Sequence, residues 1–169
     1  MAHLQVDDAT RNIRPMARTN DDDRESLFPT VGAGTADTFR VEFTPTSRDK
    51  RFGVFQLYIE GIPIGDASTT ALYPHIANLS RLCQIAEHRS KRGRGRLHLG
   101  DTFDHLDMSV EMSQSAVLFT FSTRPRSEWG EPPPWAPPVG EEMRLSVARS
   151  EFISIWRQAE PRFRLDCLD

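Results

Sequence analysis

Apolar and polar residues alternate along several stretches of this chain, and a period of two predicts β-strands with one buried face. The clearest stretches are residues 38–44, 52–60, 106–112, 116–123 and 143–147. A short extended segment at residues 62–64 follows a turn at Gly61, where positive φ carries no steric cost. Pro63 has no N–H to give to a ladder, so we expect this segment at a sheet edge.

A helical period follows at residues 70–89. The inward positions, spaced for one face of a helix, are Leu72, Ile76, Leu79, Cys83 and Ala86. His75 and His88 fall on the opposite face, where we expect solvent. Proline is tolerated only in the first turn of a helix, so Pro74 places the predicted N-cap at Thr70 or Tyr73.

A second helix is predicted near the end of the chain. Ser150 is the expected N-cap, and Pro161 is expected to help end the helix. The apolar face consists of Phe152, Ile153, Ile155, Trp156 and Ala159.

The order of these elements favours the α+β class. We predict a mainly antiparallel sheet of five to six strands with two helices packed on one face. Residues 1–36 show neither period and are predicted to be a flexible N-terminal arm, so the single domain spans 37–169. Within it, residues 124–140 contain many prolines and two tryptophans, which predicts a long semi-rigid loop.

Composition narrows the choice of partners. The net charge of −3 favours neither a general nucleic-acid binder nor a polybasic membrane protein. Cys83 and Cys167 are expected to be reduced thiols, because small secreted domains usually carry more cysteines. No apolar run is long enough to span a bilayer, so no membrane partner is expected and we predict a cytoplasmic protein.

One segment carries side chains that could bind a metal. Imidazoles and carboxylates lie close together in sequence at His98, Asp101, Asp104, His105 and Asp107. They do not follow any zinc-ligand spacing, so we favour a polar loop and strand face over a metal-dependent hydrolase. No nucleophile motif or dinucleotide fingerprint is present, and we predict no cofactor, no catalytic residues and no enzyme.

The segment at 89–96 combines basic residues with glycine, which suits phosphate contacts. It lacks aromatic residues for base stacking, and basic side chains also complement the C-terminus of a helix. A nucleic-acid-binding module therefore remains the alternative function, and a solvated helix end is the favoured interpretation.

Recognition of a basic protein partner is the function that the residues favour most. Tryptophan is enriched among interface hot spots, and carboxylates speed encounter with a basic partner. Whether Trp129 and Trp135 are exposed or fold back onto the domain remains open. The candidate contacts are Asp101, Asp104, Asp107, Glu111, Glu128, Trp129, Glu131 and Trp135.

About half of the chain resembles a known family. The segment FGVFQLYIEGIPIGD, followed by LYPHIANLSRL, resembles the front half of bacterial immunity proteins of the Imm42 type. The strand MRLSV running into SEFISIWRQAEPRF resembles the way many such proteins end. The resemblance implies a cytoplasmic antidote that binds one toxin, delivered by a secretion system or a contact-dependent apparatus. It implies that the antidote covers the toxin's active site or blocks its motion, without catalytic residues of its own.

Overall fold

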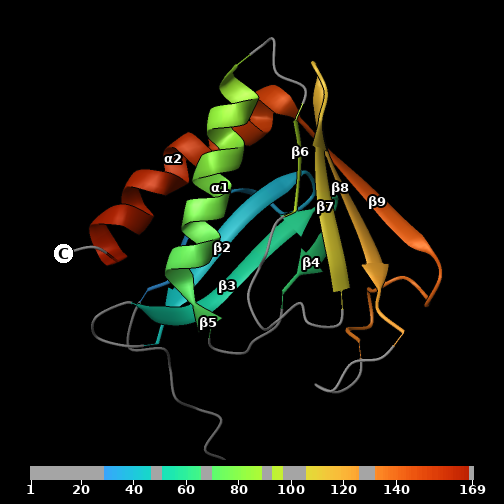
Figure 1. Cartoon of the computed structure of the whole chain (residues 1–169). Coiled ribbons are helices and arrows are strands. Elements are labelled where there is room, and N and C mark those ends of the chain that lie inside the picture. The colour runs from blue at the N-terminus through green and yellow to red at the C-terminus, as the bar shows by residue number, and fades with distance from the viewer. Residues whose placement is uncertain are drawn as a thin grey trace, which may run out of the picture.

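The computed structural model describes residues 29–46, 51–65, 70–88, 93–96, 106–125 and 132–167. Within these ranges the chain forms nine strands and two helices (Figure 1). In chain order they are β1 (Val31–Thr35), β2 (Phe39–Pro45), β3 (Phe52–Ile59), β4 (Ile62–Ile64), β5 (Thr70–Ala71), α1 (Leu72–Glu87), β6 (Gly93–Arg96), β7 (Leu106–Met112), β8 (Ala116–Thr123), β9 (Glu142–Ala148) and α2 (Arg149–Cys167).

The strands form two antiparallel sheets. Sheet A has the order β1-β2-β3-β4, and β5 pairs with β3 as well; sheet B has the order β6-β7-β8-β9. The α+β class and the antiparallel pairing are confirmed. The strands are more numerous than the five to six expected, and they form two sheets rather than one. All strands of sheet A precede α1, and all strands of sheet B follow it. Alternation defines the faces of a strand but does not define its neighbours.

Two of the additional strands lie where the sequence predicted no regular element. Val31–Thr35 falls inside the segment predicted as an arm, yet it pairs with β2 along its whole length. Gly93–Arg96 falls inside the segment predicted as a helix end and loop, yet it pairs with β7. Both are rich in glycine, which is depleted in strands, so their pairing depends on the neighbouring strand rather than on local propensity. Residues 1–28 of the predicted arm lie outside the described residues.

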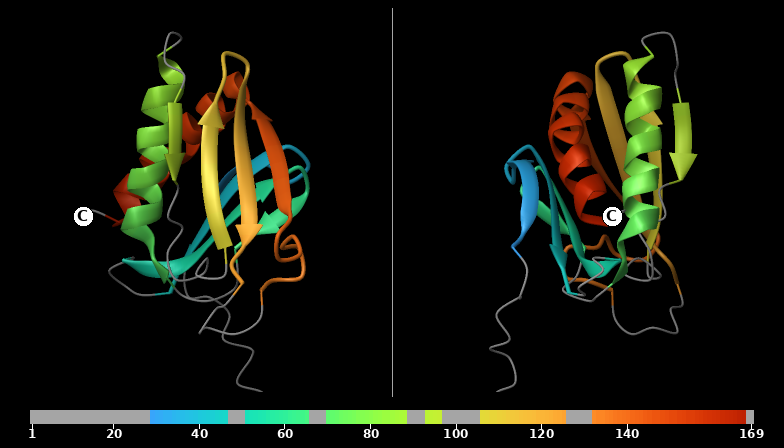
Figure 2. Two further views of the ribbon diagram at one scale, coloured as in Figure 1. Left: turned by 45° about the vertical axis from the view of Figure 1, so that its right-hand side comes forward. Right: turned by 90° about the vertical axis from the view of Figure 1, so that its left-hand side faces the viewer.

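Both sheets and both helices share one hydrophobic core. In the right-hand view of Figure 2, α2 lies between β1 and β8, and it contacts strands of both sheets. Aromatic contacts join α2 to sheet A: the rings of Phe39 and Phe152 are 5.3 Å apart, and those of Phe43 and Phe163 are 5.2 Å apart. Phe119 of β8 approaches Phe152 from the other side at 6.5 Å. The second helix therefore holds the two sheets together.

Helix α1 follows the predicted inward face, with one error. Leu72, Leu79 and the other predicted inward residues are buried. His75, which was predicted to face solvent, is fully buried with its ring stacked on Phe55 at 4.6 Å. The error arises because Phe55 of β3 and the hydroxyl of Thr70 in β5, which lies 3.3 Å from Nε2 of His75, contact this side of the helix, and sequence periodicity does not show such contacts. The N-cap is Ala71, without a side-chain cap, rather than Thr70 or Tyr73.

Helix α2 is longer than predicted at both ends. It begins at Arg149, one residue before the expected Ser150 cap, and continues past Pro161 to Cys167. A proline inside a helix removes one hydrogen bond and crowds the preceding turn. Here Phe163 lies beyond the proline and is fully buried between Phe43 and Trp156. Burial of this ring offsets the cost of the proline, so Pro161 does not end the helix.

Candidate binding surface on the second sheet

Sheet B has one face in the core and one that no described helix covers. Leu106, Met108, Val110 and Met112 of β7 are buried, so the intervening residues lie on the opposite side. The register places three cross-strand rows there, and the left-hand view of Figure 2 shows this side of β7, β8 and β9 free of helices. We call this surface the outer face of sheet B. Its rows are Asp107–Ser122–Glu142, Ser109–Thr120–Arg144 and Glu111–Leu118–Ser146.

The charges on the outer face of sheet B are mixed in sign. Asp107 accepts hydrogen bonds from Arg124 at 2.9 and 3.1 Å, and Glu142 accepts one from Arg144 at 2.8 Å. The hydrogen bond with Glu142 is the main reason why the pKa of Arg144 is raised. In the register of β6, Arg94 lies opposite Glu111. The face therefore presents paired charges with Ser and Thr between them, rather than a uniformly acidic surface.

Only part of the predicted contact set comes together on this face. Asp107 and Glu111 share it, on the same strand. Trp135 lies elsewhere: it is half-buried, and its ring meets Phe121 edge-on at 5.8 Å. Because Phe121 points into the core, Trp135 packs on the inner side of sheet B, away from Asp107 and Glu111. For this tryptophan, the structure decides the open question in favour of a loop that folds back.

A hydrogen bond supports this position of the loop. The hydroxyl of Thr123, at the end of β8, donates to the carbonyl oxygen of Pro137. The remaining predicted contacts, namely Asp101, Asp104, Glu128, Trp129 and Glu131, lie outside the described residues.

The proposed metal ligands His98, Asp101, Asp104 and His105 also lie outside the described residues, so the hydrolase alternative stays a prediction. The one described member, Asp107, is engaged with Arg124. Within the described ranges, no group of three or more His, Cys, Asp or Glu side chains converges on a point that could hold a metal ion.

Two buried groups with acid–base chemistry are present in α1. Burial raises the pKa of the Cys83 thiol to about 11, and burial lowers the pKa of His75 to about 4. At neutral pH the thiol is protonated and the imidazole is neutral. Both side chains therefore act as packing groups, as was expected for Cys83 but not for His75.

Three neighbours of the predicted acids were not foreseen from the sequence, namely Ser109, Thr120 and Arg144. Each occupies a polar position of an alternating stretch, so the signal was present in the sequence. These residues become neighbours only through the strand order β7-β8-β9 and its register, which the alternating pattern does not give.

No family model, curated protein or solved structure matches the chain. The resemblance to immunity proteins of the Imm42 type therefore stays a prediction. In the part of the chain that the structure describes, neither helix combines the length and the apolar character that a membrane span requires.

Proposed function

We propose that this protein is an immunity protein that binds a protein toxin through the outer face of sheet B. The observation that carries the proposal is the regular array of three cross-strand rows on β7, β8 and β9, over which no described helix lies and which sheet A contacts at Ser146. The opposite side of the same strands is fixed in the core by Val110, Phe119 and Leu145. A face held so firmly loses little conformational freedom when it meets a partner.

The side chains of this face favour specific binding of a partner more than high affinity. Thr120 lies at its centre, and Ser109 and Arg144 flank it in the same row. Hydroxyls and paired charges select a partner with complementary groups, because a mismatched partner leaves them desolvated and unpaired. The resemblance to immunity proteins supports a toxin as this partner. On this proposal the protein occludes the toxin's active site or blocks its motion and performs no turnover.

The test is binding to the toxic domain of a secreted protein encoded next to this chain, measured by calorimetry, together with rescue of cells that express that domain. Thr120→Arg places a long charged side chain at the centre of the outer face and should weaken binding by more than about 100-fold. Gln84→Arg introduces the same side chain at an exposed position of α1 and should leave binding unchanged. Thermal unfolding of both variants checks that they remain folded.

The possible outcomes test the proposed function and the proposed binding surface separately. If the wild-type protein neither binds the toxic domain nor rescues the cells, the proposed function is wrong. If the wild-type protein binds and Thr120→Arg binds equally well, the toxin uses another surface of this protein.

A further inference from the structure

Strand β1 is a terminal strand of sheet A, and the backbone hydrogen bonds show which of its groups point away from the sheet. Glu60 donates to the carbonyl of Thr38, and Thr46 donates to the carbonyl of Phe52, so even-numbered residues along β2 face β3. The odd-numbered residues of β2 therefore face β1. They pair with the odd-numbered residues of β1, which leaves the backbone groups of Gly32 and Gly34 on the outer edge.

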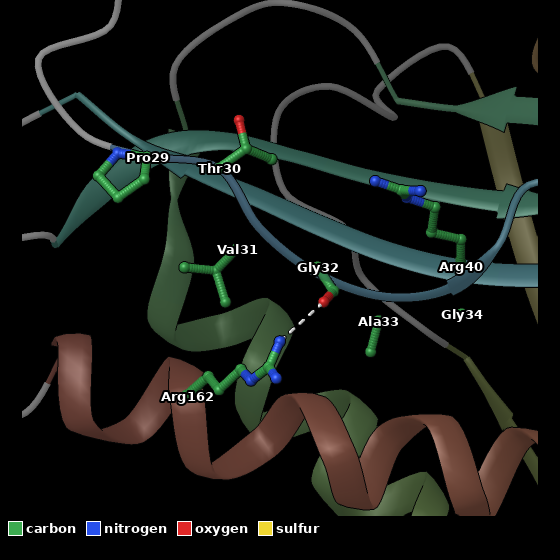
Figure 3. Close-up of a pocket in the computed structure, with 8 residues that line it drawn as sticks. All are labelled: Pro29, Thr30, Val31, Gly32, Ala33, Gly34, Arg40 and Arg162. Carbon is green, nitrogen blue, oxygen red and sulfur yellow. Dashed lines mark hydrogen bonds between the residues drawn. The ribbon is translucent and has the colours of Figure 1, made fainter.

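An arginine from α2 occupies part of this edge. The Nη1 atom of Arg162 donates to the carbonyl of Gly32 at 3.3 Å, which is a long hydrogen bond. Figure 3 shows Arg162 approaching from α2 on one side of β1, whereas Arg40 lies on the other side. Together with the backbone of residues 29–34, the two guanidiniums line an open pocket of about 490 Å³.

The pocket is positively charged and its backbone is accessible. Arg40 forms an ion pair with Glu42, which offsets one of the two charges, and Arg162 is exposed. The Nε atom of Arg40 is buried without a hydrogen-bond partner. Gly32 and Gly34 carry no side chains that would keep another chain away from the edge.

The edge strand β9 of sheet B has a different kind of contact along its edge. On β9 the outward N–H of Ser146 donates to the carboxylate of Glu60 at 2.9 Å. At the edge of β9 the Glu60 carboxylate therefore accepts a hydrogen bond from an outward N–H group. At β1 only a carbonyl is engaged, and among the described residues we find no partner for the N–H of Gly32. Edge strands with unpaired groups accept additional strands.

We propose that β1 binds an extended, acidic segment of a protein partner, which adds to sheet A as a further strand. Backbone groups of the segment pair with those of Gly32 and Gly34, and its carboxylates contact Arg40 on one side and Arg162 on the other. Arg162 exchanges its hydrogen bond with the Gly32 carbonyl for one with a carboxylate, which is the stronger pairing. This proposal is independent of the outer face of sheet B.

The test uses the full chain labelled with ¹⁵N and a six-residue synthetic peptide of Val and Glu in which two Glu residues are adjacent, so that its carboxylates point to both faces of the added strand. Titration should shift the amide signals of Gly32 and Gly34 and slow hydrogen exchange at Gly32, because that N–H gains an acceptor. A peptide with Lys in place of Glu should bind at least about 10-fold more weakly. Arg162→Gln should weaken binding of the Glu peptide at least about 5-fold. Arg81→Gln, which removes an exposed arginine from α1, is the control with the same change in net charge.

Two results would overturn the proposal. One is equal binding of the Glu and Lys peptides, or no change at Gly32 with either peptide. The other is slow exchange at Gly32 in the free protein that becomes fast when Asp21, Asp22 and Asp23 are replaced by Asn. In that case the occupant is the chain's own N-terminal segment rather than a partner.

Discussion

The carboxylate of Glu60 accepts two hydrogen bonds from Ser146, one from the backbone N–H at 2.9 Å and one from the hydroxyl at 3.2 Å. The two residues lie in different sheets, because Glu60 is in the turn between β3 and β4 and Ser146 is in the edge strand β9. Glu60 adopts a left-handed conformation with φ of 52°, which a residue with a Cβ rarely adopts. One strained turn residue thus connects sheet A to the edge of sheet B.

Removal of this connection should affect the edge more than the core. Glu60→Ala should lower the free energy of unfolding by about 1 kcal/mol, since it removes a charge-assisted hydrogen bond at an exposed site. It should also speed hydrogen exchange of the Ser146 amide. Ser146→Ala keeps the backbone bond and should leave the exchange rate of residue 146 nearly unchanged. Equal exchange rates in wild type and Glu60→Ala would show that the connection does not protect the β9 edge.

Arg149 is a buried arginine whose described partners are backbone carbonyls. Its guanidinium donates to Ala86 at 2.6 Å and to His88 at 2.9 Å, both at the C-terminal end of α1. It also donates to Ser113 at 2.6 Å, in the turn between β7 and β8. The cation lies at the negative end of the α1 dipole, which favours its charge. Its exposed fraction is only 6 %, and its hydrogen bond with the Ala86 carbonyl is buried.

Loss of this cation should strongly destabilise the folded protein. Arg149→Met leaves the buried carbonyl of Ala86 and several partly buried carbonyls without this donor, and we expect the free energy of unfolding to fall by more than about 3 kcal/mol. Arg157→Met is the matched control. Arg157 lies on the same helix and makes two hydrogen bonds of 2.7 Å with Glu87, but it is exposed, so the same substitution should change stability little. Denaturant unfolding of both variants measures the difference, and similar losses would contradict the structural role of Arg149.

Two glycines with positive φ provide a test of the β1–β2 hairpin. At Gly34, with φ of 93°, an added Cβ would lie 2.1 Å from the carbonyl oxygen of Phe39. At Gly61, with φ of 81°, nothing lies within 4 Å. Gly61→Ala should therefore cost only the backbone strain, about 1 kcal/mol. Gly34→Ala must also displace backbone and should cost at least about 3 kcal/mol. The thermal midpoints of the two variants check this order, and equal midpoints would contradict the register of β1.

His75 should make the protein sensitive to acid. Its pKa is lowered to about 4 by burial, compared with 6.5 in the unfolded chain, so the unfolded state binds more protons between these values. Stability is then complete above pH 6.5 and falls as the pH drops towards 4, by about 3 kcal/mol in total. His75→Phe keeps the stacking on Phe55 and should remove this part of the pH dependence.

Chemical denaturation at pH 7, 5.5 and 4 measures the effect. The gap in stability between His75→Phe and wild type should widen in favour of the variant as the pH falls. His88→Gln removes an exposed histidine and should keep the pH dependence due to His75 in place. A constant gap across the three pH values would show that His75 is not buried as described.

The sequence predicted the inner faces of the main strands well. Phe39, Val41 and Phe43 in β2 are all buried, and so are Val117 and Phe119 in β8. Alternation is a property of consecutive residues, so local pattern is sufficient for this prediction. The two helices were also placed correctly, although their ends were not, because helix ends depend on contacts such as that of Phe163 beyond Pro161.

Features that depend on distant residues were not predictable in the same way. Val31–Thr35 contains two glycines, and its identity as a strand comes from its partner β2. His75 is buried because Phe55, twenty positions earlier, supplies a ring to stack on. For the candidate surface, Asp107 and Glu111 were correctly selected as outward positions. Their neighbours Thr120 and Arg144 required the order of three strands.

The position of α2 has a consequence for how the protein is made. Sheet A is complete once β5 has been synthesised, yet Phe39 and Phe43 pack against Phe152 and Phe163, more than a hundred residues later. A nascent chain on the ribosome therefore carries an unfinished sheet with an exposed aromatic surface until its last helix emerges. Chaperones that bind such surfaces would therefore act on this protein before α2 has been synthesised.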